Sequence, residues 1–232
     1  MKLGIIGAMH VEVETLKKKM TDLSATEKSG MTFYEGLLEA LPVVVVVCGV
    51  GKVNAALCVQ LLCDCFAVTH IVNTGVAGSL DADLDIGDFV ISQDAMYHDF
   101  DCTCLNYMIG QVPGMDVRTF PADPMLSEQA YTAAQQVCAD HVRIGRVASG
   151  DQFVSDKAVK TRIVENTGAI CTEMEGAAIA HAAWRNGIPF VIIRAISDKA
   201  DDSAEMDYPT FEAIAAERSA LVTQLLAKSL VK

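Results

Sequence analysis

The segment PFVIIRAIS, residues 189–197, is apolar at nearly every position; Gly187 lies just before it and Asp198 directly after it. A strand that is apolar on both faces is typical of the centre of a sheet covered by helices on each side. Other segments share this β-rich character and are bounded by Gly, Pro or Asp. They are KLGIIGAM (2–9), VVVVVCG (43–49), HIVNTG (70–75), DFVISQDA (88–95) and VRIGRVAS (142–149), with a short strand expected at AIC (169–171).

Segments with helical periodicity alternate with these strands. Alternation of this kind indicates an α/β fold, which we expect to form a single domain over residues 1–232. The predicted helices cover residues 12–20, 52–66, 125–140, 155–167, 175–187 and 209–230.

The last predicted helix carries two specific expectations. Pro209 should lie in its first turn, where a missing N–H does no harm. The apolar residues at helical spacing should form one buried stripe of Phe211, Ile214, Ala215, Leu221, Leu225 and Leu226.

Composition excludes several classes of protein. Of the 232 residues, 51% are hydrophobic and 21% are charged, so a large core is available. The formal charge of −12 argues against a nucleic-acid partner, because that role needs a basic surface. The longest apolar run, residues 40–50, is too short for a bilayer, which takes about 20 residues. The eight cysteines lie in a core-rich chain without a secretory signal, so we expect a cytoplasmic protein without a disulfide framework.

Two glycine-rich turns follow predicted strands. CGVGKVN (48–54) resembles the start of a dinucleotide fingerprint, but Asn54 stands where the third glycine should be and no acid closes the motif. In open α/β sheets, ligands bind beyond the carboxyl ends of strands. The two turns are therefore expected to line the floor of a pocket, through Val50 in the first and through Ala77 and Gly78 of TGVAG (74–78) in the second.

Three carboxylates also follow strands. Glu12 comes just after the first strand, Asp198 directly after the strand at 189–197, and Glu175 opens a helix after the strand at 169–171. Each one could be an ordinary solvated acid at a strand end. Together they point toward one edge of the sheet, where two acids can divide the roles of proton donor and water activator.

Arg194 lies inside an apolar strand and needs a partner there. A pocket carboxylate such as Glu175 is a natural partner. The pair could serve the pocket, or it could be a structural buried ion pair.

Histidine spacing gives no sign of a catalytic metal, because neither H-x-x-x-H nor H-E-x-x-H occurs. The loop from Cys102 to Pro124 is long and rich in Gly and Pro. Loops of that length usually carry function or bind a partner.

Six blocks, in order, resemble the 5′-methylthioadenosine/S-adenosylhomocysteine nucleosidase family. They are GIIGAMHVEVE (4–14), NTGVAG (73–78), YHDFD (97–101), SGDQFV (149–154), EMEGAAIAH (173–181) and RAISDKAD (194–201). The resemblance runs from Met1 to the final helix. It implies a mixed central β-sheet flanked by helices, a homodimer, and hydrolysis of an adenosine-type nucleoside in methionine salvage, with no metal or organic cofactor.

The resemblance also implies a role for individual residues. Asp198 matches the general acid that protonates adenine at N7, and Glu12 matches the base that activates water. Glu175 matches the residue that grips the ribose hydroxyls. The supporting residues are Met174 under the sugar, Phe153 stacked on adenine, Val154 reading its edge through the backbone, Ser197 orienting Asp198, and Arg194 supporting Glu175 and the water.

The 5′ end of the substrate is expected to meet Met9, Val50 and Phe211. The partner subunit of the homodimer is expected to add Leu105, Tyr107 and Pro113 to the same pocket. The sequence does not rank methylthioadenosine, S-adenosylhomocysteine, 5′-deoxyadenosine and futalosine-type nucleosides, because they differ in the group that this variable part of the pocket receives.

A purine nucleoside phosphorylase of the same superfamily is the main alternative. A phosphorylase needs cations beside the anomeric carbon. Related phosphorylases take arginines from the turn after the first strand, here GAMHVEVE (7–14), and from the strand before the TGVAG turn, here VNTGVAG (72–78). Here Glu12 and Thr74 stand in those regions, and no arginine precedes Arg118. We therefore predict a hydrolase. Retention of both Glu12 and Asp198 argues against a second alternative, a nucleoside-binding relative without catalysis.

One residue departs from the family pattern. Val76 stands in NTGVAG where the family often has Ser. Because valine cannot hydrogen-bond, water placement would rest on Glu12 and Arg194, and we expect slower or altered turnover.

Overall fold

The computed structural model describes residues 1–231, so the final position of the expected domain, 232, lies outside the described residues. Ten strands form one sheet in the order β10-β6-β8-β9-β5-β1-β4-β3-β2, with β7 paired to β6. The strands near its middle are β1 (Leu3–Gly7), β4 (Leu41–Val47), β5 (His70–Ser79), β6 (Phe89–Tyr97), β8 (Val142–Ser149), β9 (Cys171–Glu173) and β10 (Phe190–Asp198).

The sheet is mixed. Parallel pairs join β1 to β4, β1 to β5 and β10 to β5, whereas β10 runs antiparallel to β6 and β5 antiparallel to β9. Because β10 pairs with both β5 and β6, the path β5–β10–β6–β8–β9 returns to β5 and closes on itself. The predicted α/β fold with a mixed central sheet is confirmed.

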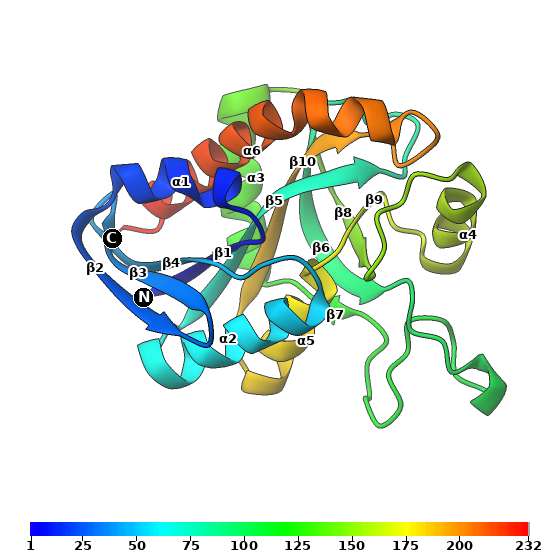
Figure 1. Ribbon diagram of the computed structural model, residues 1–232, viewed down its shortest axis with the longest axis horizontal. Coiled ribbons are helices and arrows are strands. Elements are labelled where there is room, and N and C mark those ends of the chain that lie inside the picture. The colour runs from blue at the N-terminus through cyan, green and yellow to red at the C-terminus, as the bar shows by residue number, and fades with distance from the viewer. Residues whose placement is uncertain (232) are drawn as a thin grey trace.

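Helices cover the sheet on both sides (Figure 1). α1 (His10–Lys19), α3 (Pro124–Cys138) and α6 (Ala204–Ser229) lie along one face, and α2 (Lys52–Phe66) and α5 (Gly176–Asn186) lie along the other. α4 (Lys157–Thr167) lies apart from both layers and packs on a small cluster of its own. Within residues 1–231, none of the helices combines the length and apolar character that a bilayer crossing requires.

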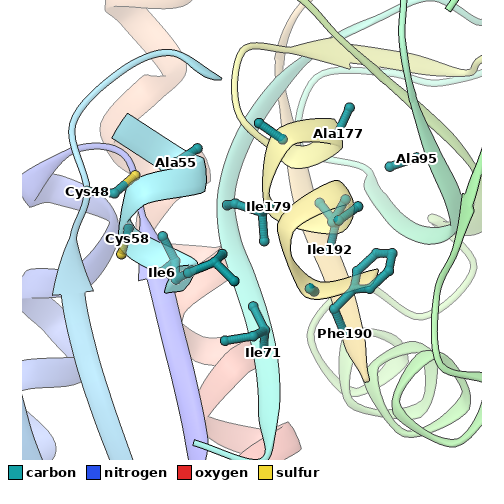
Figure 2. Close-up of a cluster of buried hydrophobic side chains, with 14 of the residues drawn as sticks. Ile6, Cys48, Ala55, Cys58, Ile71, Ala95, Ala177, Ile179, Phe190 and Ile192 are labelled. Carbon is teal, nitrogen blue, oxygen red and sulfur yellow. The ribbon is translucent and has the colours of Figure 1, made fainter. Parts of the chain in front are cut away.

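The core explains why these segments adopt this arrangement. Figure 2 shows Ile6, Ile71 and Ile192 of the strands facing Ala55 of α2 and Ile179 of α5. All five side chains are fully buried. The small residues of α2 and α5 let both helices approach the sheet closely, which buries the strands that are apolar on both faces.

The sequence patterns missed a hairpin and a short strand. β2 (Thr21–Lys28) and β3 (Met31–Leu38) pair antiparallel, and every side chain of β2 is exposed. Ser29 and Gly30 both have positive φ, as a tight hairpin turn requires. TDLSATEK shows no apolar alternation because this edge strand buries neither face, so backbone pairing alone holds it. β7 (Phe120–Pro121) was missed because it is so short.

The expectations for the last helix were partly wrong. α6 begins at Ala204, so Pro209 lies inside the helix and not in its first turn. Ala215 and Leu226 are buried as expected, but Ile214 is 58% exposed and Leu221 is also exposed. α6 packs closely on β5 and β10, and the positions facing the sheet are filled by smaller residues, which the apolar stripe did not include: Ala216, Ser219, Ala220 and Thr223.

Candidate active site

A pocket of about 560 Å³, counted to its open mouth, lies where β1, β4, β5 and β10 end. β9 crosses the end of β5 there, pairing Thr172 with Gly78. The pocket brings together most of the predicted site residues, which come from six separate segments of the chain. These are Met9, Glu12, Val50, Val76, Ala77, Gly78, Phe153, Val154, Met174, Glu175, Ser197 and Asp198.

Glu12 folds back from the first turn of α1 over the end of β1. Its Oε2 accepts the backbone N–H groups of Ala8 (2.6 Å) and Met9 (2.9 Å), and Oε1 accepts that of Val76 (3.3 Å). Burial raises the pKa of Glu12, although the positive charge of Arg194 and the three N–H groups act in the opposite direction. The carboxylate is therefore rigidly held and more basic than a free glutamate, as a base for water should be.

Asp198 is the last residue of β10. Its Oδ1 accepts the N–H of Ala200 (2.8 Å) and its Oδ2 accepts the hydroxyl of Ser197 (2.9 Å). Burial raises the pKa of Asp198, with those two hydrogen bonds acting against the shift. A buried aspartate with a raised pKa can hold a proton for donation.

Glu175 is the N-cap residue of α5, and its Oε1 accepts the N–H of Gly51 (2.8 Å). Burial and then the negative charge of Glu173 raise the pKa of Glu175 to about 8. Of the buried acids at this site, Glu175 is the one that accepts a single hydrogen bond, since Asp198 accepts two and Glu12 and Glu173 accept more. It therefore keeps the most capacity for an incoming ligand.

Arg194 does not pair with Glu175, so that prediction was wrong. Its Nη2 donates to Glu173 Oε2 (2.5 Å) and to the side-chain oxygen of Asn73, and its Nη1 donates to the carbonyl of Ile193 (3.0 Å). The guanidinium is 2% exposed and lies behind the pocket wall. Of the two interpretations left open by the sequence, a buried ion pair describes its contacts, but the partner is the neighbouring glutamate.

Glu173 is the residue that the sequence interpretation overlooked. It accepts the hydroxyl of Ser149 and the N–H groups of Glu175 (3.1 Å) and Gly176 (2.7 Å), in addition to Arg194. The Ser149 hydroxyl oxygen in turn accepts the N–H of Ala177 (2.7 Å). Glu173 and Ser149 thus satisfy the free N–H groups at the start of α5. The lack of Ser, Thr, Asp or Asn directly before α5 was the available signal that an acceptor must come from elsewhere.

The mouth of the pocket is apolar. Phe153 packs edge-on against Tyr208 with ring centroids 5.4 Å apart, and the Tyr208 hydroxyl donates to the sulfur of Met9 (3.3 Å). Phe211, predicted for this position, does not line the pocket, and Tyr208 does. Tyr208 is almost one turn closer to Asp198 along α6, about 4.5 Å at the rise of an α-helix.

Leu105, Tyr107 and Pro113 belong to the loop between β6 and β7, which projects away from the sheet (Figure 1). None of them lines the pocket of its own chain, and Leu105 is 64% exposed. Their expected contact with the pocket of a second subunit stays a prediction.

The charge of the pocket wall is one-sided. Glu12, Glu173, Glu175 and Asp198 line it, and no Lys, Arg or His among the described residues does so. The one nearby guanidinium is already occupied by Glu173. Across residues 1–231 no cluster of three or more His, Cys, Asp or Glu residues is arranged to hold a metal. The wall is thus suited to a neutral or cationic group and not to an anion such as phosphate.

Comparison with known proteins agrees with this geometry. The sequence model of the phosphorylase superfamily matches residues 2–230. A 5′-methylthioadenosine/S-adenosylhomocysteine nucleosidase of Staphylococcus aureus (strain MRSA252) is 39% identical over 98% of this chain and 100% of its own length. The nucleosidase of that name from Neisseria meningitidis, solved in complex with methylthio-immucillin-A, superposes with a TM-score of 0.95 at 37% identity, covering 99% of both chains.

A futalosine hydrolase of Helicobacter pylori strain 26695 superposes nearly as well, with a TM-score of 0.94 at 30% identity over 99% of this chain and 98% of its own. The full-length matches agree with the residue blocks that carried the resemblance. The chain therefore belongs to the phosphorylase superfamily and, within it, to the 5′-methylthioadenosine/S-adenosylhomocysteine nucleosidase family.

Proposed function

We propose that this protein hydrolyses the N-glycosidic bond of 5′-methylthioadenosine and S-adenosylhomocysteine, releasing adenine and the thioribose. The observation that carries the proposal is the pocket wall, which holds four carboxyl groups and no free cation, since the nearby Arg194 is paired with Glu173. Such a wall stabilises the positive charge that develops on the sugar as the bond to the base breaks. It gives inorganic phosphate no partner, which favours water as the nucleophile.

We assign the proton transfers to Asp198 and Glu12, the two acids that line the pocket without a charged partner in hydrogen-bond contact and with carboxyl groups fixed by at least two hydrogen bonds each. Asp198 donates its proton to adenine N7, so that the base leaves as a neutral molecule with the electron pair of the broken bond. Glu12 takes a proton from water as the oxygen bonds to the anomeric carbon. Each such acid or base contributes about 10²–10⁴ in rate. The raised pKa of Asp198 and the three N–H groups that orient Glu12 support these roles.

The remaining pocket residues hold the substrate in our proposal. Glu175 accepts the ribose hydroxyls, and Met174 packs under the sugar. Phe153 stacks on adenine, while the backbone of Val154 reads the edge of the base, with Ala77 and Gly78 forming the floor. Met9 and Val50 receive the 5′ substituent, and Tyr208 joins them there in place of Phe211.

The preference among 5′ substituents is a separate question, because the likeness to a futalosine hydrolase leaves a second substrate class in view. The 39% identity to a methylthioadenosine/S-adenosylhomocysteine nucleosidase, against 30% to the futalosine hydrolase, favours the former substrates. Comparing kcat/KM for methylthioadenosine and futalosine on the same preparation separates the two.

We also propose a homodimer in which the loop between β6 and β7 completes the partner's pocket. Apolar side chains that are exposed in the single chain support it: Val53 and Leu57 on α2, and Leu105 and Met108 on the loop. Patches of this kind mark interaction surfaces. Dilution to the monomer should weaken substrate binding, and a fully active monomer would refute the shared site.

The cellular setting proposed is methionine salvage in the cytoplasm. All eight cysteines are free, as is usual in a reducing compartment. The thioribose released from methylthioadenosine would return to methionine by that route.

The deciding experiment is product analysis after incubation with 5′-methylthioadenosine, with and without inorganic phosphate. Adenine and free methylthioribose should form equally in both reactions. Methylthioribose 1-phosphate that forms only with phosphate would make the protein a phosphorylase. Release of no adenine in either reaction would favour another nucleoside or binding without catalysis.

A further inference from the structure

Lys52, Asp99 and Asp151 form a charged cluster just outside the pocket. Lys52 Nζ lies 2.6 Å from Asp99 Oδ2 and 3.7 Å from Asp151 Oδ2. The Lys52 backbone N–H donates to Asp151 Oδ1 (2.9 Å), and the Asp151 N–H donates to Asp99 Oδ2 (2.9 Å). The cluster joins the loop before α2, the loop after β6 and the loop after β8.

A lysine at the first position of α2 is unfavourable by itself, because the N-terminus of a helix carries partial positive charge. α2 has no acid of its own in the first turn. Asp151 therefore caps the helix from a distant loop, and Asp99, with Asp151 farther off, neutralises the Lys52 side chain. Such a contact fixes the loop after β8 to the start of α2.

Two glycines permit this close approach. A Cβ at Gly150 would come within 2.5 Å of the His98 ring, and one at Gly51 would lie 3.1 Å from Asp151 Oδ1. Gly51 also has a φ of +98°, which side-chain-bearing residues rarely adopt. The two loops are thus packed tightly at this junction, and a side chain at either glycine would push them apart.

Both chain segments run from the cluster directly into the pocket wall. On one side, Val50 lines the pocket and the Gly51 N–H donates to Glu175. On the other side, Asp151 is followed by Gln152, Phe153 and Val154, which all line the pocket. In the proposed function, the first segment faces the 5′ substituent through Val50 and holds Glu175 toward the sugar through Gly51, and the second segment faces adenine.

We propose that Lys52 is a positioning residue that holds these two loops at the separation spanned by a whole nucleoside. The inference rests on the proposed function. A ligand that touches both loops needs the clamp, whereas adenine alone touches chiefly the loop after β8. Loss of the clamp should therefore act mainly on binding of the complete substrate.

The test compares Lys52→Met with wild type, using methylthioadenosine for kinetics and adenine for calorimetric binding. KM should rise about tenfold, which corresponds to a loss of about 1.4 kcal/mol in binding free energy. The kcat should stay within about twofold of the wild-type value. The fold increase in the Kd of adenine should be smaller than the fold increase in KM by a factor of about three or more. Lys52→Arg, which keeps the charge, should restore most of the KM.

Lys2→Met is the matched control. Lys2 Nζ lies 2.5 Å from Glu35, and its side chain is 24% exposed against 23% for Lys52, but it is far from the pocket in the sheet. It should leave KM and the adenine Kd at wild-type values. Asp99→Asn removes the same ion pair and replaces Lys52→Met if that variant folds poorly. The double variant Lys52→Met/Asp99→Asn should raise KM no more than Lys52→Met alone.

Equal kinetics for Lys52→Met and Lys2→Met would overturn the clamp, and so would equal losses for methylthioadenosine and adenine. Failure of the proposed function looks different, because the wild type itself would then release no adenine. In that case the calorimetric affinity for methylthioadenosine replaces KM, and an unchanged affinity in Lys52→Met overturns the inference.

Discussion

The inner wall and the mouth of the pocket are built in opposite ways. On the inner wall, Glu12 and Glu173 are buried and accept several hydrogen bonds each. At the mouth, Phe153 is 45% exposed and packs edge-on against Tyr208, with one hydroxyl-to-sulfur contact to Met9. The inner groups can barely move, whereas the mouth is held by weak, adaptable contacts.

The difference separates two tasks. Bond cleavage needs charges whose positions are fixed before the substrate arrives, because reorganising them would raise the barrier. Accepting different 5′ substituents needs a surface that can repack. Substitutions at the inner wall should therefore change kcat or stability strongly, and those at the mouth should change substrate choice.

The largest effect is expected from Asp198→Asn. Asparagine keeps the shape, its oxygen can still accept the N–H of Ala200, and its NH2 group can donate to the Ser197 oxygen. It has no proton of suitable acidity to donate to the base. The kcat for methylthioadenosine should fall by about 10³ or more, while calorimetry should still detect binding of a methylthioadenosine analogue. Asp202→Asn, an exposed acid of the same loop, is the control. Full activity in Asp198→Asn would mean that the acid lies elsewhere.

Glu173→Gln should have the next largest effect, and on folding. It leaves the guanidinium of Arg194 buried without its ion-pair partner. Removing one partner of a buried pair costs about 3–5 kcal/mol, which urea unfolding would measure. Glu35→Gln breaks the surface pair with Lys2 and should cost less than about 1 kcal/mol. Equal losses in the two variants would show that the inner wall is no more tightly built than the surface.

Glu175 should make stability depend on pH in a defined direction. Its pKa rises from 4.5 to about 8 on folding, so the folded state holds a proton that the unfolded state has lost. This contribution is fully present below pH 4.5 and is lost as pH rises through about 8, by about 1.4 kcal/mol per pH unit at most. The free energy of unfolding of Glu175→Gln should therefore fall less between pH 6 and pH 8 than that of wild type. Parallel curves would contradict the raised pKa.

Sequence patterns predicted the fold where burial left a signal in the residues. Strands apolar on both faces, such as β4 and β10, were located to within two residues at each end, whereas the polar edge strand β2 gave no such signal. The site was predictable where acids follow strands, as at Glu12 and Asp198. The roles of Glu173 and Glu175 were not separable, because Ser149 and Arg194, the partners that distinguish Glu173, come from β8 and β10 and meet it only in the folded sheet. Tyr208 was missed because α6 begins five residues earlier than its pattern indicated.

At Val76 the inner wall has an apolar side chain, unlike at Glu12 and Glu173, whose side chains accept several hydrogen bonds. The Val76 N–H donates to Glu12, but its side chain places an apolar surface in the pocket wall beside that carboxylate. A serine there would offer the attacking water one more hydrogen bond, worth about 1 kcal/mol or roughly fivefold in rate if it forms only in the transition state. Val76→Ser should therefore increase kcat for methylthioadenosine by about two- to fivefold with little change in KM. Val76→Thr supplies the hydroxyl with nearly the original volume and should act in the same direction. Unchanged kinetics in both variants would mean that Glu12 alone positions the water, so that the inner wall needs no further donor.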